Sequence, residues 1–417
     1  MVKLNMKKIA TTLLLFGFAA TAIASQEQSD DDWGDDWGDD EQQTAVSPWQ
    51  THGFINYSYG DFIHHNPLFN PSDKTLHELR GQLNLKYNHD KFTIDSKSDL
   101  VYDNVLKSLD FKQRQLSLST KLSEQLDIKL GRQILTWGTG DYLFLNDLFP
   151  KDWQSFFAGR EDAYLKAPSD SIKLSYYIND VAINLAWTPE FTPDNYLTGE
   201  RFSFYSPLAQ SNIAPAQHFV VQHEDNEQLS TRIKWQHQGV EYAIYGYKGF
   251  WSTPQGITAQ GIPYFPKMNS LGASFITPAS KGILKGEFSH YNSAAALDQT
   301  RYLIGYEQEV IKNLTASGQF YVEQNRHHDL IAKDHYRTLL TLRLNYLVDQ
   351  QTYNYQLFVF YSPSDKDAYI RPQIRYRHND QWSISIGANL FTGKHHYSFF
   401  GQHEENSNAW ITVKRQF

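Results

Sequence analysis

Basic side chains that alternate with apolar ones are the strongest chemical signal in this 417-residue chain. Over residues 337–348, Leu340 and Leu342 share one face of an extended segment, whereas Arg337 and Arg343 share the other. Because side chains of a strand point alternately to its two faces, a charged face opposite an apolar face must meet water. A row of fixed positive charges along a water-filled passage would concentrate anions and let them step between weak sites.

Basic residues outnumber acids on the polar faces of the predicted strands. The basic residues predicted to point inward are Arg80, Lys86, Lys97, Arg232, Lys234, Lys285, Arg337, Arg343, Arg371, Arg375, Arg377 and Lys414. The acids predicted to point inward are Asp95, Asp99, Glu287, Glu307 and Glu323. Two interpretations are open: the cations select anions in a pore, or they pair with acids elsewhere and stiffen the wall.

Eighteen extended segments would position these side chains. Their predicted bounds are 51–59, 76–88, 91–102, 110–122, 125–137, 171–178, 181–190, 228–238, 240–251, 268–278, 282–292, 299–311, 314–325, 335–348, 352–362, 367–378, 381–392 and 408–417. Short connections alternate with generally longer ones, as periplasmic turns and extracellular loops do in outer-membrane barrels. We therefore predict an all-β, closed antiparallel transmembrane barrel of about 18 strands. Sixteen strands is the alternative count, and both termini are predicted to be periplasmic.

The two ends of the chain predict the compartment. Three lysines precede an apolar stretch that starts at Ile9, and Ala22 and Ala24 form a small-residue cleavage site. Residues 1–24 are therefore predicted to be a signal peptide; a retained anchor is the alternative, although the apolar stretch is short for a membrane span. The chain closes on an alternating strand that ends at Phe417, which is typical of bacterial outer-membrane barrels.

Composition restricts the chemistry. The chain contains no cysteine, which excludes disulfides, thiolate metal sites and cysteine nucleophiles. Aromatic residues make up 15% although the mean hydropathy is only −0.55, a combination that suits a barrel with aromatic belts. The motifs GxSxG and HExxH and the P-loop are absent from the sequence. We predict no enzyme activity, no cofactor and no nucleic-acid partner, and expect the lipid of the outer membrane to contact the protein.

Histidine pairs occur in predicted outer loops, at 64–65, 327–328 and 395–396. Clustered imidazoles can capture zinc or copper, but adjacent histidines on an extended chain point in opposite directions. We predict solvated loop histidines and no metal site.

Residues 25–48 carry nine acids and no lysine or arginine, and they contain the repeat DDWGDDWGDD. Such a segment cannot bury enough apolar surface to fold alone, so we predict a disordered periplasmic tail ahead of a barrel over residues 49–417. The residues predicted to bind a partner, a periplasmic or inner-membrane transport component, are Asp32, Trp33, Asp35, Asp36, Trp37, Asp39 and Asp40. Entry of the tail into the lumen, calcium binding and a solvated linker are the alternatives.

The sequence from residue 129 to residue 175 carries a further local pattern, GRQ at 131–133, WG at 137–138, and then spaced aspartates and prolines. This segment resembles the corresponding region of large outer-membrane barrels in the alginate-export-like and related porin families. The resemblance implies a loop that folds inward and narrows the pore. The constriction residues it implies are Asp141, Asp147, Asp152, Arg160 and Glu161. The alternative is an ordered external loop capped by Trp153, Phe156 and Phe157.

Together these patterns predict an outer-membrane channel that conducts or exports an anionic or amphiphilic solute. Some members of the resembling families are thought to work beside inner-membrane exporters, and the acidic tail would provide the coupling. The alternative is a barrel that acts as a scaffold or surface receptor and displays the connections 191–227 and 393–407. A barrel hydrolase is a third candidate.

Overall fold

The computed structural model describes residues 47–417 except 71, 215–220, 223, 296 and 328–333. The predicted signal peptide and nearly all of the predicted acidic tail lie outside the described residues. Within the described part of the chain, no helix is both long enough and apolar enough to cross a membrane.

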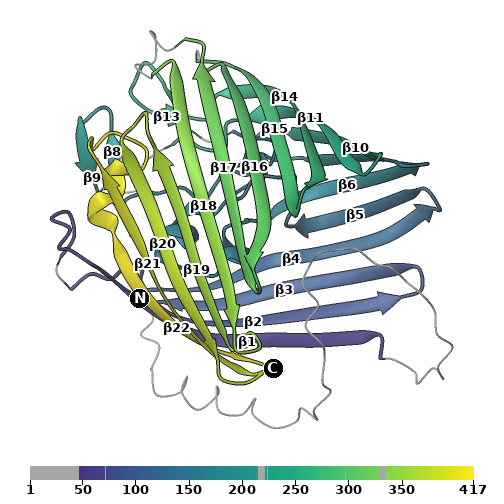
Figure 1. Ribbon diagram of the computed structural model, residues 1–417, viewed down its shortest axis with the longest axis horizontal. Helices are drawn as coiled ribbons and strands as arrows, with labels where there is room; N and C mark the ends of the chain where they lie inside the picture. Colours follow the sequence, from purple (N-terminus) through teal and green to yellow (C-terminus); the bar gives the residue numbers. More distant parts are fainter. Residues whose placement is uncertain (1–46, 71, 215–220, 223, 296, 328–333) are drawn as a thin grey trace, which may run out of the picture. The chain divides into compact units, whose positions relative to one another are not determined.

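Eighteen antiparallel strands form one continuous sheet, and pairing of β1 with β22 closes it (Figure 1). Their bounds are β1 Trp49–Phe62, β2 Leu76–His89, β3 Phe92–Asp103, β4 Ser108–Ser123, β5 Leu126–Gln133, β6 Ser169–Ile178, β7 Val181–Thr188, β10 Gln228–His237, β11 Val240–Phe250, β14 Lys267–Ala279, β15 Gly282–Ser293, β16 Gln299–Ile311, β17 Leu314–Asn325, β18 Tyr336–Val348, β19 Tyr353–Ser362, β20 Asp367–Arg377, β21 Trp382–Gly393 and β22 Asn408–Gln416. The prediction of a closed all-β barrel with 18 strands is confirmed, and the alternative count of 16 is wrong.

Short and longer connections alternate along the chain, so the barrel has a turn end and a loop end. The connections at the turn end include 90–91, 124–125 and 179–180, whereas those at the loop end include 134–168 and 189–227. Because this alternation is set by local turn signals, most strand bounds lie within a few residues of their predicted positions.

The predicted C-terminal end of the fifth strand, at residue 137, is wrong. β5 stops at Gln133, and from Ile134 the chain turns into the barrel, where Trp137 is buried. The alternating pattern continues past Gln133 in sequence, but packing of Trp137 against Phe149 and Arg232 directs the backbone inward.

The longer connections contain short elements that the sequence did not indicate. Their bounds are β8 Phe204–Ser206, β9 Ser211–Ile213, β12 Gly256–Ile257, β13 Pro263–Tyr264, α2 Trp153–Ala158, and the 3-10 helices η1 Asp162–Tyr164 and η2 Gly401–Asn406. In α2, the side chain of Asp152 accepts a hydrogen bond from the Ser155 amide at 2.7 Å, and Gly159 ends the helix with a φ of 82°. These elements span two to six residues, too few to establish a helical or strand period.

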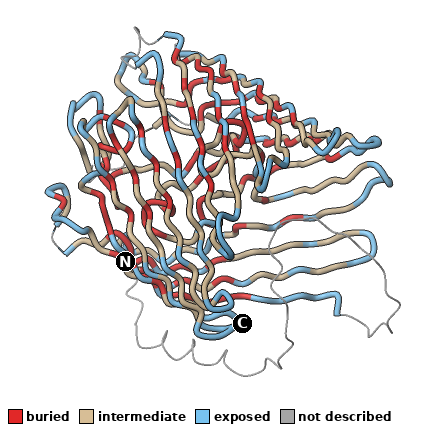
Figure 2. Tube along the Cα trace, viewed as in Figure 1, coloured by how far each residue is buried: buried red, intermediate tan, exposed pale blue. Residues whose placement is uncertain are grey.

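The outer face of the barrel is apolar and its inner face is polar. On β2, Leu79 and Leu83 are 45% and 41% exposed, whereas Glu78 and Arg80 are 1% and 3% exposed. Figure 2 shows the same interleaving of buried and exposed residues along other strands. This polarity is the reverse of a soluble β-barrel, in which apolar side chains point to the interior.

The main apolar cluster fills part of the interior and contains residues of a connection as well as of the wall. Phe156 and Phe157 of α2 pack against Tyr369 of β20, and Phe157 also packs against Phe391 of β21. Because Tyr369 and Phe391 lie on the inner face, α2 lies inside the barrel. The predicted inward-folding loop is therefore confirmed as part of the fold, and an external loop capped by these aromatics is excluded.

Candidate functional site

Residues 134–168, which we name the inward connection, are held by strands on well-separated parts of the wall. The side chain of Glu287 on β15 accepts a hydrogen bond from the Gly140 amide at 2.9 Å. The guanidinium of Arg114 on β4 donates to the carbonyl of Ala163 at 2.8 Å. Since β4 and β15 are separated by six strands in the closed sheet, the inward connection crosses the lumen.

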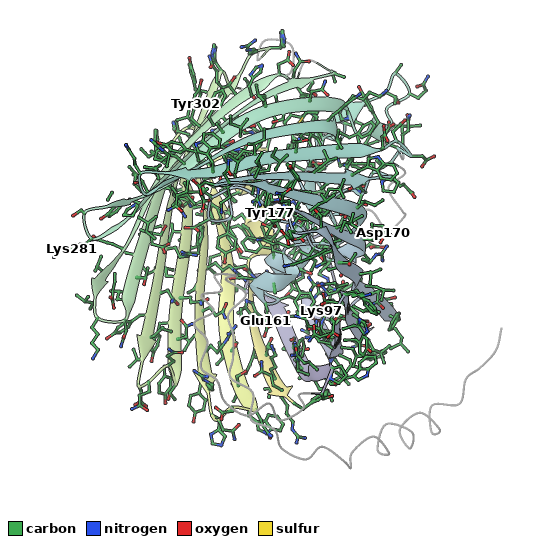
Figure 3. The ribbon with its side chains drawn as sticks, turned by 90° about the vertical axis from the view of Figure 1, so that its right-hand side faces the viewer. Lys97, Glu161, Asp170, Tyr177, Lys281 and Tyr302 are labelled. Atoms are coloured by element: carbon green, nitrogen blue, oxygen red, sulfur yellow. The ribbon has the colours of Figure 1, made fainter. Side chains whose placement is uncertain are left out.

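Three consecutive residues of the inward connection each pair with a different strand. The pairs are Arg160 with Glu78 on β2 (2.6 Å), Glu161 with Lys414 on β22 (3.0 Å) and Asp162 with Arg371 on β20 (2.5 Å). We name these three residues the clamp. In Figure 3, Glu161 lies in the interior between the yellow and purple strands. The clamp bridges the arc of wall from β20 to β2.

A buried charge network continues from the clamp into the wall. The Arg80 guanidinium lies 3.1 Å from the carboxylate of Glu78 and 2.6 Å from that of Asp99. Asp103, four residues after Asp99 on the same face of β3, pairs with Arg201 of the connection 189–227. Glu78 and Asp103 were not predicted as site residues, although their positions share the inward parity of Arg80 and Asp99. A complete list of inward acids by parity would have found both.

The other predicted cations also have acids beside them. The pairs are Arg337 with Asp365 (2.7 Å), Arg343 with Glu307 (2.5 Å) and Lys234 with Glu241 (2.7 Å). Arg232 instead packs over the Trp137 ring at 5.2 Å. Arg337, Arg343 and Arg371 therefore do not form one uncompensated positive patch, because each has its own carboxylate.

Arg375 and Arg377 have different surroundings. Arg375 lies opposite Asn354 on β19 and Ser385 on β21, two neutral side chains. Arg377 donates to the backbone and side-chain oxygens of Gln351 at 3.5 Å. The Asp162 carboxylate of the clamp is close enough to interact electrostatically with Arg375 as well as with Arg371.

The predicted acids of the constriction differ in what they do. Asp141 lies 3.1 Å from Lys285, and Asp147, which is 4% exposed, lies 3.1 Å from Lys151 within the inward connection itself. Asp152 caps α2, and Glu287 is occupied by amides of the inward connection. Asp147 and Asp152 therefore hold the shape of the inward connection, whereas Arg160 and Glu161 border open space.

Asp95, a predicted inward acid of the wall, lies opposite Lys86 in the β2–β3 register.

A small cavity of about 20 Å³, partly open to solvent, lies beside the clamp. It is lined by Asn56, Ser58, Glu78, Arg80, Gly159, Arg160, Glu161, Tyr164, Gln373, Ser385, Trp410, Thr412 and Lys414. We name it the clamp cavity. That volume is close to the space that one water molecule needs.

Asp194 joins three connections at the loop end. Its carboxylate accepts hydrogen bonds from the Lys151 amide (2.8 Å), the Trp153 indole (2.8 Å) and the Ser252 hydroxyl (3.0 Å). Burial raises the pKa of Asp194 to about 6. No sequence motif marks this aspartate, because its partners lie in two other connections.

His403 of η2 lies against the rings of Phe157 and Phe391. Burial lowers the pKa of this imidazole to about 4. Within the described ranges, no three histidine or acidic residues gather in a geometry that could hold a metal ion. His327 lies 2.9 Å from Asp298, and His328 lies outside the described residues.

No protein-family model matches the chain, and no curated protein sequence matches it either. Solved structures do match. Acinetobacter baumannii OccAB3 has a TM-score of 0.57 and 9% identity, covering 88% of this chain and 99% of its own. OccAB4 of the same species has a TM-score of 0.57 and 10% identity, covering 89% and 99%. Pseudomonas aeruginosa OccK3 (OpdO) has a TM-score of 0.55 and 8% identity, covering 88% and 95%. At these identities the likeness concerns the fold alone, and the predicted membership of the alginate-export-like families is not confirmed.

Proposed function

We propose that this protein is a channel in the outer membrane of a Gram-negative bacterium and that it conducts or exports a polar solute through its lumen. The observation that carries the proposal is the reversed polarity of the barrel, with an apolar outer face and a charged interior. A closed barrel satisfies its backbone hydrogen bonds without a free strand edge, as a lipid environment requires. The likeness in fold to outer-membrane porins supports the same conclusion.

Aromatic side chains on the outer face support a place in a bilayer. Tyr336 and Tyr346 are 54% and 39% exposed at the two ends of β18, ten positions apart. Ten residues of a strand tilted by about 40° span about 25 Å along the barrel axis, the height of the apolar band in outer-membrane barrels. Lipid of the outer membrane would contact the band between these two tyrosines.

We propose further that the lumen favours anionic or amphiphilic solutes. Lys129 of β5 and Lys173 of β6 lie directly opposite each other in register, and β2 and β3 add Lys86 and Lys97 to the same part of the inner wall. Asp95 opposes Lys86, and Asp127 shares the inner face of β5 with Lys129, so four lysines stand beside two acids in this part of the wall. Closely spaced like charges raise the local concentration of the opposite ion.

Planar-bilayer recording tests both parts of the proposal. The purified protein should conduct KCl, and its reversal potential in a KCl gradient should report a preference for chloride. Exchanging Arg375 and Arg377 for glutamine should move the reversal potential toward that of a cation-preferring channel. The control is the double variant Arg371→Gln/Asp162→Asn, which removes both charges of one ion pair and so leaves the net charge unchanged.

Two results would contradict the proposal. An unchanged reversal potential in the Arg375→Gln/Arg377→Gln variant would reject anion preference by these residues. A barrel that conducts no KCl would reject the channel and favour the scaffold or receptor displaying the connections 191–227 and 393–407. The apolar cluster inside the barrel is the observation that favours this second function.

We propose that residues 25–48 bind a periplasmic or inner-membrane transport component. The support is the sequence alone: nine acids and two tryptophans that a partner pocket could bury. Deletion of 29–41 should abolish co-purification of that component, whereas Trp33→Ala/Trp37→Ala should weaken it and keep the charge. Co-purification that survives the deletion would refute the proposal.

A further inference from the structure

The clamp narrows the lumen beside the strands from β20 to β2. The clamp cavity, which lies between the clamp and this part of the wall, holds about 20 Å³, enough for one water molecule. Glu161 and Asp162 are the clamp residues that reach β22 and β20, and Figure 3 shows Glu161 in the interior. A solute larger than water can therefore pass on this side of the inward connection only when these two side chains leave the wall.

The residues on either side of these two acids are anchored. Arg160 pairs with Glu78 at 2.6 Å, and the two side chains are 11% and 1% exposed. The carbonyl of Ala163 accepts a hydrogen bond from the Arg114 guanidinium at 2.8 Å. Because the backbone is held at both ends, the movement that opens this side is a rotation of the two acidic side chains, and α2 stays in place.

Water reaches the acids more easily than it reaches their cations. The Asp162 side chain is 42% exposed, whereas that of Arg371 is 5% exposed. The Glu161 side chain is 28% exposed, whereas that of Lys414 is 13% exposed. Ion pairs that water reaches contribute little net stability and weaken as salt screens them. The acids are therefore the ends of these pairs that can leave, and dissolved ions favour their release.

Asp162 has a second cation within reach. Arg375 lies four residues after Arg371 on the same face of β20, further toward the turn end. Its guanidinium already interacts electrostatically with the Asp162 carboxylate, which also accepts a hydrogen bond from the Tyr142 hydroxyl. The wall of β20 thus offers Asp162 two alternative partners, one that closes this side of the lumen and one that leaves it open.

We propose that Glu161 and Asp162 form an ion-pair latch that switches the lumen between a narrow and a wide state. In the narrow state they pair with Lys414 and Arg371, as the structure shows. In the wide state Asp162 pairs with Arg375 and Glu161 faces water. Dissolved anions favour the wide state because they compete for the released cations. The inference rests on the proposed channel function and adds to it a regulation of pore width by ionic strength.

Planar-bilayer recordings of the full-length mature protein in KCl test the latch. The wild type should show two conductance levels after correction for bulk conductivity, and the time spent in the larger level should rise between 0.1 and 1 M KCl. Glu161→Gln should raise the ratio of time in the larger level to time in the smaller one about three- to fivefold at 0.1 M KCl. That is the change expected when one partly exposed ion pair is lost.

Crosslinking separates a moving latch from a fixed constriction. Because the chain contains no cysteine, Glu161→Cys/Lys414→Cys carries the only two thiols. Bridging them with a short bis-methanethiosulfonate reagent should abolish the larger level, and dithiothreitol should restore it in the same bilayer. The matched control is Arg132→Cys/Asp170→Cys, which replaces an ion pair of 2.7 Å between β5 and β6, outside the inward connection. Bridging the control pair should leave both levels unchanged.

Each failure has a different meaning. A wild-type protein that conducts no KCl would overturn the proposed channel and the latch with it. KCl conductance that the bridge between positions 161 and 414 does not alter, or alters no more than the control bridge does, would overturn the latch and leave the channel intact. If the cysteine variant does not insert into bilayers, Glu161→Gln decides the result, and a ratio equal to that of the wild type would overturn the latch.

Discussion

Replacing Arg160 by leucine should release the inward connection from β2. The Arg160 guanidinium donates to both carboxylate oxygens of Glu78, at 2.6 to 3.1 Å, and to the Ser155 hydroxyl at 3.1 Å. The Glu78 side chain is 1% exposed and the Arg160 side chain 11% exposed. The leucine would leave the buried Glu78 carboxylate with Arg80 and Arg201 as its cationic neighbours, and it would also remove the 3.5 Å contact between Arg160 and Asp103.

The magnitude follows from this burial. Removing one partner of a buried ion pair costs about 3–5 kcal/mol, and we expect about 3 kcal/mol because Arg80 still compensates part of the charge. If local opening limits amide exchange, 3 kcal/mol corresponds to exchange that is on the order of 100-fold faster in residues 153–165.

Hydrogen exchange measured by mass spectrometry in detergent micelles would test this expectation. Arg132→Leu is the matched control, because Arg132 pairs with Asp170 at 2.7 Å while the two side chains are 42% and 61% exposed. Such an exposed pair contributes about 1 kcal/mol or less. If Arg160→Leu accelerates exchange of residues 153–165 no more than Arg132→Leu does, the clamp does not hold the inward connection.

Three further perturbations test the packing of the connections. Gly159→Ala should destabilise the inward connection by about 2–4 kcal/mol, from left-handed backbone strain and overlap of the new methyl with the Trp410 indole, whereas Gly261→Ala should show the strain alone; equal proteolysis rates for the two variants would contradict this. Because the pKa of His403 is lowered to about 4, the unfolded chain takes up a proton that the folded chain refuses as pH falls below 6.5, which lowers stability by up to about 3 kcal/mol near pH 4. His403→Phe should remove that loss in denaturant titrations, and an unchanged pH slope would contradict the assignment. The pH dependence that Asp194 contributes has the opposite sign. Because its pKa is raised to about 6, the folded state binds the proton more tightly than the unfolded chain does, so stability rises as pH falls from 7 toward 4. Asp194→Asn should abolish this gain, and a gain that persists in the variant would show that another group titrates.

The alternation of side chains made the strands predictable. Leu79, Leu83, Leu340 and Leu342 occupy every second position of their strands, and all four lie on the exposed outer face. Alternation is a property of the extended backbone itself, so the face of each residue can be assigned from its neighbours in sequence. Turn residues such as Asn179 and Gly239, both with positive φ, mark the ends of strands in the same local way.

The partners of the charged residues were not predictable in this way. Glu78 and Arg160 are 82 positions apart, and the pair depends on where the inward connection meets β2. The same holds for Asp162 and Arg371, 209 positions apart. The sequence therefore left anion selection and structural pairing both open. The contacts favour pairing for Arg371.

The sequence by itself determined the closed barrel, most of the strand positions and which face of each strand is apolar and which is polar. These features depend on local periodicity and on the difference between lipid and water. Only the tertiary structure decided that the inward connection crosses the lumen, that Asp147 and Asp152 shape it, and that Asn56 and Trp410 meet in one cavity. Those features arise from contacts between segments far apart in the chain, for which a single sequence carries no local periodic signal.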